Sequence, residues 1–300
     1  MTFICKLSNF QKVQEFNRAF DMAPKEPANY LSGYTDEFEH FQIDEYQHIR
    51  PEIFNNPKII RLRLDLIDEE IEELSHAIEI NDFIETRDAI ADILYVAYGM
   101  ADVLGINIDM VFKQNIKNNE MSRYDNIHNK MLMSIGKYAN HDERNDKPIG
   151  LTNFDWIKVI YDNIPQQTIS LFESISYTYK ELETICLAID SKNVEKESFI
   201  KIGNCICNLL KFVYTYAYFA DIDANSDFAI VHTSNMSKLC NTEDDARNTV
   251  TDYEDKFENG NSPYDSPYYY ELPSIGKWIV KNRSTGKALK NIKYKKVSFD

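Results

Sequence analysis

Five carboxylate side chains in two neighbouring segments have the residue types and the spacing of a divalent metal site. They are Glu69, Glu70 and Glu73 in the first segment, and Asp88 and Asp92 in the second. Mg²⁺ prefers oxygen ligands, uses few protein carboxylates, and keeps water molecules that phosphate oxygens can replace. The five acids therefore predict a Mg²⁺ site that acts on a phosphate group.

The first segment, RLRLDLIDEEIEELSHAI at residues 61–78, has the period of an amphipathic helix. At about 100° per residue, Glu70 and Glu73 lie on the shoulder of an apolar stripe, and Glu69 lies one step further round. The stripe consists of Ile67, Ile71, Leu74 and Ile78. The remaining acids, Asp65, Asp68, Glu72 and Glu79, are expected to face water. We therefore expect Glu70 and Glu73 to lean toward the protein interior.

The second segment, DAIADILYVAYGMADVLGINID at residues 88–109, places an acid inside an apolar helix. Asp92 precedes nine residues without a charge, and Asp88 lies one helical turn earlier on the same stripe. A bare buried carboxylate costs several kcal/mol, so such a group is protonated, hydrogen-bonded or bound to a cation. The alternative is that the glutamates form an ordinary solvated helix face. The aspartates within the apolar run favour the metal site.

The composition favours a globular, cytoplasmic protein and limits its partners. The 300 residues suit one large domain or two smaller ones, and 43% of them are hydrophobic. A net charge of −15 argues against a nucleic acid polymer as partner. Five cysteines without zinc spacing indicate reduced thiols, and the N-terminus shows no export signal. Polar residues interrupt the apolar run at 199–220, so we expect a core helix there and no membrane span.

The hydrophobic pattern repeats once along the chain. The pattern at residues 61–78 returns at 171–189, and the pattern at 91–107 returns at 207–223. We predict an internal duplication, with a first unit at residues 1–150 and a second at 151–300. Within the first unit, residues 9–23 form an amphipathic helix, 28–57 are a loop with at most one short helix, and Gly105 caps the second acidic helix.

The second unit keeps one of the five acids. Lys180, Glu181 and Thr184 stand opposite Glu69, Glu70 and Glu73, and Asn204 and Asn208 stand opposite Asp88 and Asp92. We therefore expect no metal in the second unit.

The second unit has polar and basic segments that the first unit lacks. Residues 231–238, VHTSNMSK, contain Asn235 and Lys238, and no lysine of the first unit stands opposite Lys238. Residues 277–296 carry eight Lys or Arg and no acid. They predict a β-hairpin about Ser284 to Gly286. Four cations lie close to that turn: Lys281, Arg283, Lys287 and Lys290. The alternative is a solvated basic hairpin or tail without a ligand.

Together these segments resemble the all-α nucleoside triphosphate pyrophosphohydrolases, which include MazG-like enzymes, phosphoribosyl-ATP pyrophosphohydrolases and dimeric dUTPases. The resemblance rests on the glutamate motif at 69–73, the aspartates within DAIADILYVAYG, and GINID at 105–109. The run ending in Lys238 and TGKALK at 285–290 complete it. It implies a helical bundle, built here from two tandem MazG-like units. The implied reaction cleaves a nucleoside triphosphate between its α and β phosphates with Mg²⁺, releasing monophosphate and pyrophosphate.

The resemblance also implies roles for individual residues. Glu70, Glu73, Asp88 and Asp92 would be metal ligands. Glu69 and Glu70 would be catalytic, with Glu69 either a further ligand or the residue that orients the attacking water. Asn235 and Lys238 would contact the nucleotide, and Lys287 and Lys290, with the neighbouring Arg283, would contact phosphates.

Two features of this sequence depart from the family pattern. Many relatives have a glutamate three residues before the second aspartate, where this chain has Ala89 and uses Asp88 on the same helix face. Relatives with one unit generally form dimers or tetramers, whereas this chain carries two units. We expect one composite site per chain, in a monomer that replaces a dimer or in a homodimer.

Two questions stay open from the sequence. The other function that the sequence permits is a non-catalytic helical protein that binds nucleotides or partners. The preferred base is also open. A dUTP-like or dCTP-like substrate is plausible from the family, and scattered candidates for a base pocket are Phe16, Phe20, Asn115 and Asn235.

Overall fold

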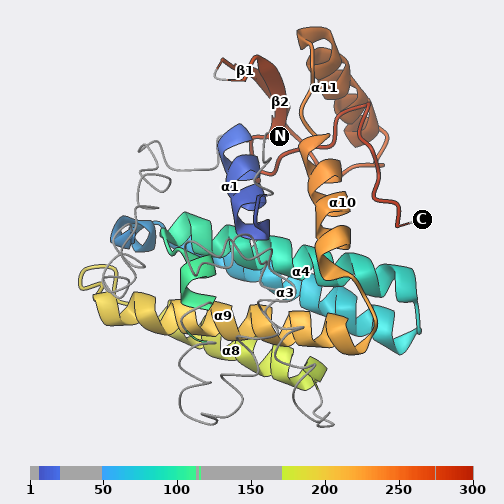
Figure 1. Cartoon of the computed structure of the whole chain (residues 1–300). Helices are drawn as coiled ribbons and strands as arrows, with labels where there is room; N and C mark the ends of the chain where they lie inside the picture. The colour runs from blue at the N-terminus through green and yellow to red at the C-terminus, as the bar shows by residue number, and fades with distance from the viewer. Residues whose placement is uncertain (1–6, 21–48, 113–114, 116–170, 274, 300) are drawn as a thin grey trace, which may run out of the picture. The chain divides into compact units, whose positions relative to one another are not determined.

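The computed structural model of the chain describes residues 7–20, 49–112, 115, 171–273 and 275–299 (Figure 1). These residues are mostly helical and end in a two-stranded antiparallel hairpin, which confirms the predicted fold class. They divide into two compact units, Met1–Gln11 with Glu26–Phe228, and Lys12–Lys25 with Ala229–Asp300. The predicted boundary at residue 150 lies outside the described residues, so the division there stays a prediction.

The first unit contains the two acidic helices as one helical hairpin. Helix α3 (Pro57–Glu79) follows the short 3₁₀ helix η2 (Pro51–Asn55), and α4 (Phe83–Leu104) follows after a three-residue connection. Asp82 caps the start of α4 by accepting hydrogen bonds from the backbone N–H groups of Ile84 and Glu85. Gly105 ends α4 with a φ of 73°, the left-handed conformation that glycine adopts easily. The predicted helix cap is thus confirmed.

A second helical hairpin packs against the first. Helix α8 (Leu171–Ala188) pairs with α9 (Lys196–Phe219), α3 contacts α8, and α4 contacts α9 (Figure 1). Helix α9 is the predicted core helix, and Phe199, Leu209, Leu210 and Val213 within it are fully buried. In the described part of the chain, no helix is long and apolar enough to span a membrane.

The helix ends of the two hairpins match at the positions that the predicted duplication pairs. The correspondence that sets Asn208 opposite Asp92 also sets Asp221 opposite Gly105, and Asp221 has a φ of 56°. After each of these residues, a buried isoleucine donates its N–H to a carbonyl in the last turn of the helix. An Asx side chain then caps the next helix, Asn107 bonding the N–H of Met110 and Asp223 that of Ser226. The match agrees with a duplication, which stays a prediction.

The second unit combines helix ends with the β-hairpin. It contains most of α1 (Asn9–Ala19), the end of α10 (Ala224–Met236), and all of α11 (Glu243–Glu258). Strands β1 (Pro267–Leu272) and β2 (Lys277–Asn282) pair with Tyr268 opposite Lys281. Cys240, Ala246, Val280 and Leu289 form its small core, against which Trp278 packs. The four described cysteines, Cys186, Cys205, Cys207 and Cys240, are all buried free thiols.

The predicted hairpin turn at Ser284 to Gly286 was wrong. The strand paired with β2 lies before it in the sequence, because β1 and β2 are joined through the turn that ends at Gly276. A tight turn does exist at the predicted place, since Gly286 donates its N–H to the carbonyl of Asn282. Beyond that turn the chain makes an isolated bridge between Lys281 and Ala288 and forms no further strand in the described residues. The sequence signal therefore marked a turn that follows the hairpin.

Candidate active site

The acids of α3 divide by exposure much as helical periodicity predicts. Ile67, Ile71 and Leu74 are buried, Glu70 is half-buried, and Glu69 is exposed. Two expectations were wrong. Glu73 is exposed, and Ile78 is 37% exposed because it lies in the last turn of α3, beyond the packed part of the helix.

The aspartates of α4 lie on a helix that is buried along most of its length. Asp88 and Asp92 are both half-buried, while Ala89, Ile90, Ala91 and Ile93 around them are buried. Helix α4 is positioned for this by its packing on α3 and α9 and by the Asp82 cap at its start. The helix hairpin thus places carboxylates of α4 against those of α3.

The pKa of Glu70 is raised by its surroundings. Burial is the largest cause that raises its pKa, and the second is the negative charge of Asp92. Glu73, Glu69 and Asp88 act in the same direction, and together these causes raise the pKa of Glu70 to about 9. A side chain of one helix thus experiences the charges of all four other predicted site acids. Such repulsion is relieved by a proton or by a cation.

The donor set suits a hard cation, although it is not arranged as a closed site. Carboxylate oxygens on two facing helices are the ligand type that Mg²⁺ uses. Among the residues that the structure describes, no group of three or more His, Cys, Asp or Glu is placed so that it could hold a metal ion. The carboxylates therefore fit Mg²⁺ by their chemistry, and an ion would have to draw their oxygens together.

Two cations on the acidic helices were not anticipated from the sequence. Arg87, next to Asp88 on α4, donates from Nε and Nη2 to the two carboxylate oxygens of Asp227, at 2.8 and 2.6 Å. Asp227 on α10 is fully buried, so this pair ties the first half of α4 to α10. Arg63 on α3 has its pKa lowered by burial, which the charge of Asp102 opposes. No sequence motif predicts that Arg87 meets Asp227 or that Arg63 lies near Asp102, because the partners are far apart along the chain.

The corresponding positions of the second hairpin have other partners. Lys180, opposite Glu69, lies 3.7 Å from Asp68 and 3.9 Å from Glu183, and it sits over the ring of Tyr179. Asn204, opposite Asp88, accepts a hydrogen bond of 3.0 Å from Asn115, one of the base-pocket candidates. These contacts show what the corresponding side chains do in this hairpin, and the expectation that it holds no metal stays a prediction.

The predicted nucleotide contacts lie in the second unit. The ammonium group of Lys238 donates to Oδ1 of Asn235 at 2.6 Å. The guanidinium of Arg283 lies 4.1 Å from the ring centre of Tyr268, and Lys290 lies 4.9 Å from that of Tyr294. Arg283, Lys287 and Lys290 are exposed and thus available to an anion. The roles of these residues, and the single composite site, stay predictions.

Comparison with known proteins gives the family. The chain is 32% identical over 294 residues to "Uncharacterized protein L479" of Acanthamoeba polyphaga mimivirus, an alignment that covers 98% of this chain and 95% of the relative. No solved structure matches the chain. The model of the family described as phosphoribosyl-ATP pyrophosphohydrolase matches residues 35–119, which include all five predicted site acids. The chain therefore belongs to the phosphoribosyl-ATP pyrophosphohydrolase family of the MazG-like nucleoside triphosphate pyrophosphohydrolases.

Proposed function

We propose that this protein is a Mg²⁺-dependent pyrophosphohydrolase that cleaves the bond between the α and β phosphates of a nucleoside triphosphate. Its family supports a nucleotide pyrophosphohydrolase activity. The observation that carries the proposal is the convergence of four negative charges on the half-buried Glu70. Folding such a group of acids together is unfavourable unless a proton or a cation neutralises part of their charge, and a cation of the substrate complex would do so at neutral pH.

Glu70, Glu73, Asp88 and Asp92 would hold the metal ion. When bound, Mg²⁺ neutralises phosphate charge and lowers the pKa of a coordinated water. Glu69, exposed beside these residues, would orient the attacking water, and Glu69 or Glu70 would accept its proton. The water oxygen forms a bond to the α phosphorus. The bond from this phosphorus to the oxygen that bridges the α and β phosphates breaks, and pyrophosphate leaves with the electron pair on that oxygen. The products are a nucleoside monophosphate and pyrophosphate.

The basic residues of the second unit would bind the substrate. We propose that Asn235 and Lys238 contact the nucleotide, and that Arg283, Lys287 and Lys290 contact phosphate oxygens. The exposure of the last three residues supports this role. Charge-assisted hydrogen bonds from lysine and arginine are strong and suit phosphate. We also propose a cytoplasmic protein that is a monomer or a homodimer.

The proposal is tested by release of pyrophosphate and orthophosphate from a panel of ribo- and deoxyribonucleoside triphosphates. Each nucleotide is incubated with the full chain in Mg²⁺ or in EDTA, and Glu70→Gln serves as the site variant. Mg²⁺-dependent pyrophosphate release that is lost in the variant supports the class and the bond cleaved. Release of orthophosphate alone contradicts the cleavage position. Absence of turnover with every nucleotide, together with nucleotide-induced thermal stabilisation, favours the non-catalytic binding protein.

A further inference from the structure

Two arginine side chains of the first unit approach the last turn of α4. Arg50 stands directly before η2, and its backbone N–H donates to the carbonyl of Leu104 at 3.0 Å. Arg63 lies on α3, and the negative charge of Asp102 acts on it from α4. Asp102 and Leu104 both belong to the last turn of α4, and η2 contacts both α3 and α4. The two arginines therefore lie at the same end of the hairpin that α3 and α4 form.

Both guanidinium groups are at least partly removed from water, and neither has the partner that such a group normally has. Nη1 of Arg50 is fully buried and has no hydrogen-bond partner among the described residues. Arg63 is half-buried, and burial lowers its pKa. Within the described part of the chain, no carboxylate lies within ion-pair distance of Arg63. A buried charged donor without an acceptor is strongly unfavourable, so an anion is expected here.

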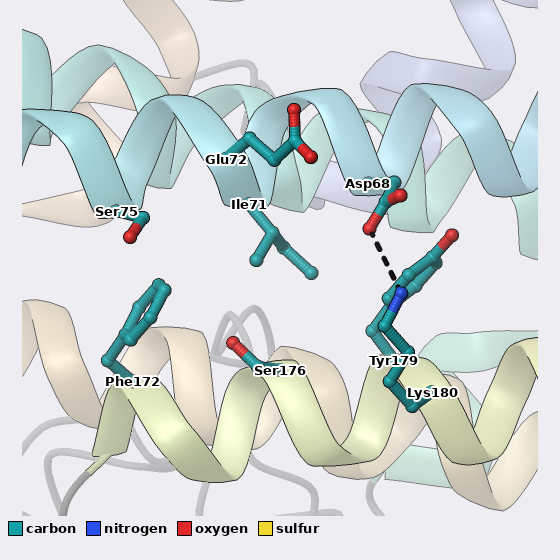
Figure 2. A pocket seen from close by; sticks show the side chains of 8 residues that line it. All are labelled: Asp68, Ile71, Glu72, Ser75, Phe172, Ser176, Tyr179 and Lys180. Carbon is teal, nitrogen blue, oxygen red and sulfur yellow. Dashed lines mark ion pairs between the residues drawn. The ribbon is translucent and has the colours of Figure 1, made fainter.

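Other cations of the first unit show the usual arrangement. Arg87 donates to both carboxylate oxygens of Asp227. Lys180 points from α8 toward Asp68 of α3 and lies 3.7 Å from it (Figure 2). Each of these cations is paired with an acid of another helix. Arg50 and Arg63 differ from them, although both are nearer to the interior than Lys180, which is exposed.

The end of α4 cannot supply the missing acceptors. Backbone N–H groups already donate to the carbonyls of Ala101, Asp102 and Leu104. The side chain of Asp102 carries one negative charge, so it can neutralise only one of two guanidinium groups. Glu52, the acid of η2, is exposed to water. A further negative charge is therefore needed at this end of the hairpin.

The second hairpin lacks this arrangement together with the acids. The predicted duplication sets Ser174 opposite Arg63 and Tyr218 opposite Asp102. Neither charge is present in the hairpin that keeps one of the five carboxylates. The buried arginine thus occurs in the hairpin that carries the predicted metal ligands, which is expected if both serve one ligand-binding region.

We propose that Arg50 and Arg63 form an anion subsite that binds a phosphate group. A guanidinium group matches two phosphate oxygens with parallel N–H groups. One such fork saturates a carboxylate, whereas a phosphate group offers three terminal oxygens to two arginines. Arg63 precedes Glu70 by seven residues on the same face of α3, so the subsite lies about 10 Å along the helix from the predicted metal ligands. The phosphate group belongs either to the bound nucleotide or to free inorganic phosphate.

The test is thermal unfolding of the full chain in increasing sodium phosphate near neutral pH, in EDTA and without nucleotide. Sodium chloride at equal ionic strength is the control for salt. We expect phosphate to raise Tm by about 3 °C and the rise to saturate below about 20 mM. Phosphate also stabilises proteins by exclusion from their surface, but that effect does not saturate and would persist in site variants.

Substitution of the two arginines locates the binding site. Arg63→Met should abolish the saturable shift, and Arg50→Met should at least halve it. Arg61→Met is the matched control, because Arg61 lies two residues from Arg63 and pairs with Glu183 at the surface. This variant should keep the full shift. Arg63→Met should also be at least as stable as the wild type in chloride alone, since it removes a buried charge without a partner.

Three results would overturn the inference. The first is a wild-type Tm that rises no more in phosphate than in chloride, and the second is a full phosphate shift in Arg63→Met. The third is an Arg63→Met variant that is clearly less stable than the wild type in chloride or fails to fold, because the arginine would then have a structural partner. Should Arg50→Met fail to fold, the Arg63→Met titration decides alone.

Steady-state kinetics then identify the source of the phosphate, and this step rests on the proposed function. If the subsite holds a phosphate of the nucleotide, inorganic phosphate should inhibit competitively and Arg63→Met should raise KM about 10-fold. If it holds free phosphate, KM should be the same in Arg63→Met as in the wild type. Both results keep the subsite. The thermal titration contains neither metal nor nucleotide, so its failure leaves the proposed function intact, and an absence of turnover leaves the subsite intact.

Discussion

The side-chain hydroxyl oxygens of Tyr98 on α4 and Tyr214 on α9 lie 2.9 Å apart in a hydrogen bond, and both residues are fully buried. They are corresponding residues in the predicted duplication. Each tyrosine ring also makes a T-shaped contact with a phenylalanine, Tyr98 with Phe228 and Tyr214 with Phe112, and the angle between the ring planes is near 90° in both. Phe112 and Phe228 are themselves corresponding residues in the predicted duplication. In a two-fold dimer, residues on the axis contact their own copies. The pair is therefore placed as it would be if two units of one chain replaced a dimer.

Removing either hydroxyl group should lower the stability of the compact unit that contains both tyrosines, but by different amounts. Tyr98→Phe removes one buried hydrogen bond and should lower the free energy of unfolding by about 1 kcal/mol. Tyr214→Phe should cost about 2 kcal/mol, because the Tyr214 hydroxyl also accepts a hydrogen bond of 3.0 Å from Asn9. Urea unfolding measures both changes. Tyr177→Phe at a site that is 75% exposed is the control, and equal stability of all three variants contradicts the prediction.

Removing Arg87 should destabilise the protein more than removing the charge of Asp227, its partner in a buried ion pair. Arg87→Met leaves a fully buried carboxylate without its cation and should lower the free energy of unfolding by about 3 kcal/mol. Asp227→Asn should cost less, since the Arg87 side chain is 22% exposed and reaches water. The matched control is Arg247→Met, which removes exposed ion pairs and should cost under about 0.5 kcal/mol. Similar losses for Arg87→Met and Arg247→Met would show that the buried pair has no special role.

Substitution of the central acids should remove turnover. We expect Glu70→Gln and Asp92→Asn each to lower kcat at least about 100-fold, the size of losing one charge-stabilising group. Steady-state pyrophosphate release with saturating nucleotide and Mg²⁺ measures the effect. Glu79→Gln on the same helix should keep wild-type kcat. Near-normal activity in both central variants would refute the metal assignment.

The metal-free protein should lose stability as pH rises. The pKa of Glu70 is raised from 4.5 to about 9 in the folded chain, so folding favours the protonated carboxyl. Its contribution to stability is present below about pH 4.5 and is lost as pH rises toward about 9. Urea unfolding in EDTA at pH 5 and pH 8 should show this loss, and Mg²⁺ at pH 8 should reverse it. In Glu70→Gln the loss between the two pH values should be smaller, and an equal loss would disprove the cause.

Lys238 should affect substrate binding without affecting the metal. Lys238→Ala removes the ammonium group proposed to contact the nucleotide and should raise KM about 10-fold. The thermal shift caused by Mg²⁺ alone should stay as in the wild type. Lys256→Ala removes an exposed lysine that pairs with Asp252, and it should leave KM unchanged. A loss of the Mg²⁺ shift in Lys238→Ala would mean that this lysine supports the carboxylate site itself.

The local sequence determined the helices and which acids they carry. The period of α3 placed Ile67 and Leu74 in the core and left Glu70 half-buried, because helical geometry depends only on spacing along the chain. Gly105 correctly predicted the end of α4, because few other residues adopt a positive φ without strain. Family motifs, which are also local, were sufficient for the recognition of the superfamily.

Only the tertiary structure decided which distant residues meet. The Tyr98–Tyr214 hydrogen bond, the Arg87–Asp227 ion pair and the partner strand of β2 all join segments whose pairing no local pattern encodes. The raised pKa of Glu70 likewise required α3 and α4 to pack together, because Asp92 acts on it across the helix pair. The spacing of residues along the chain determines which side chains lie on each face of a helix. The packing of the helices determines which distant residues those side chains contact.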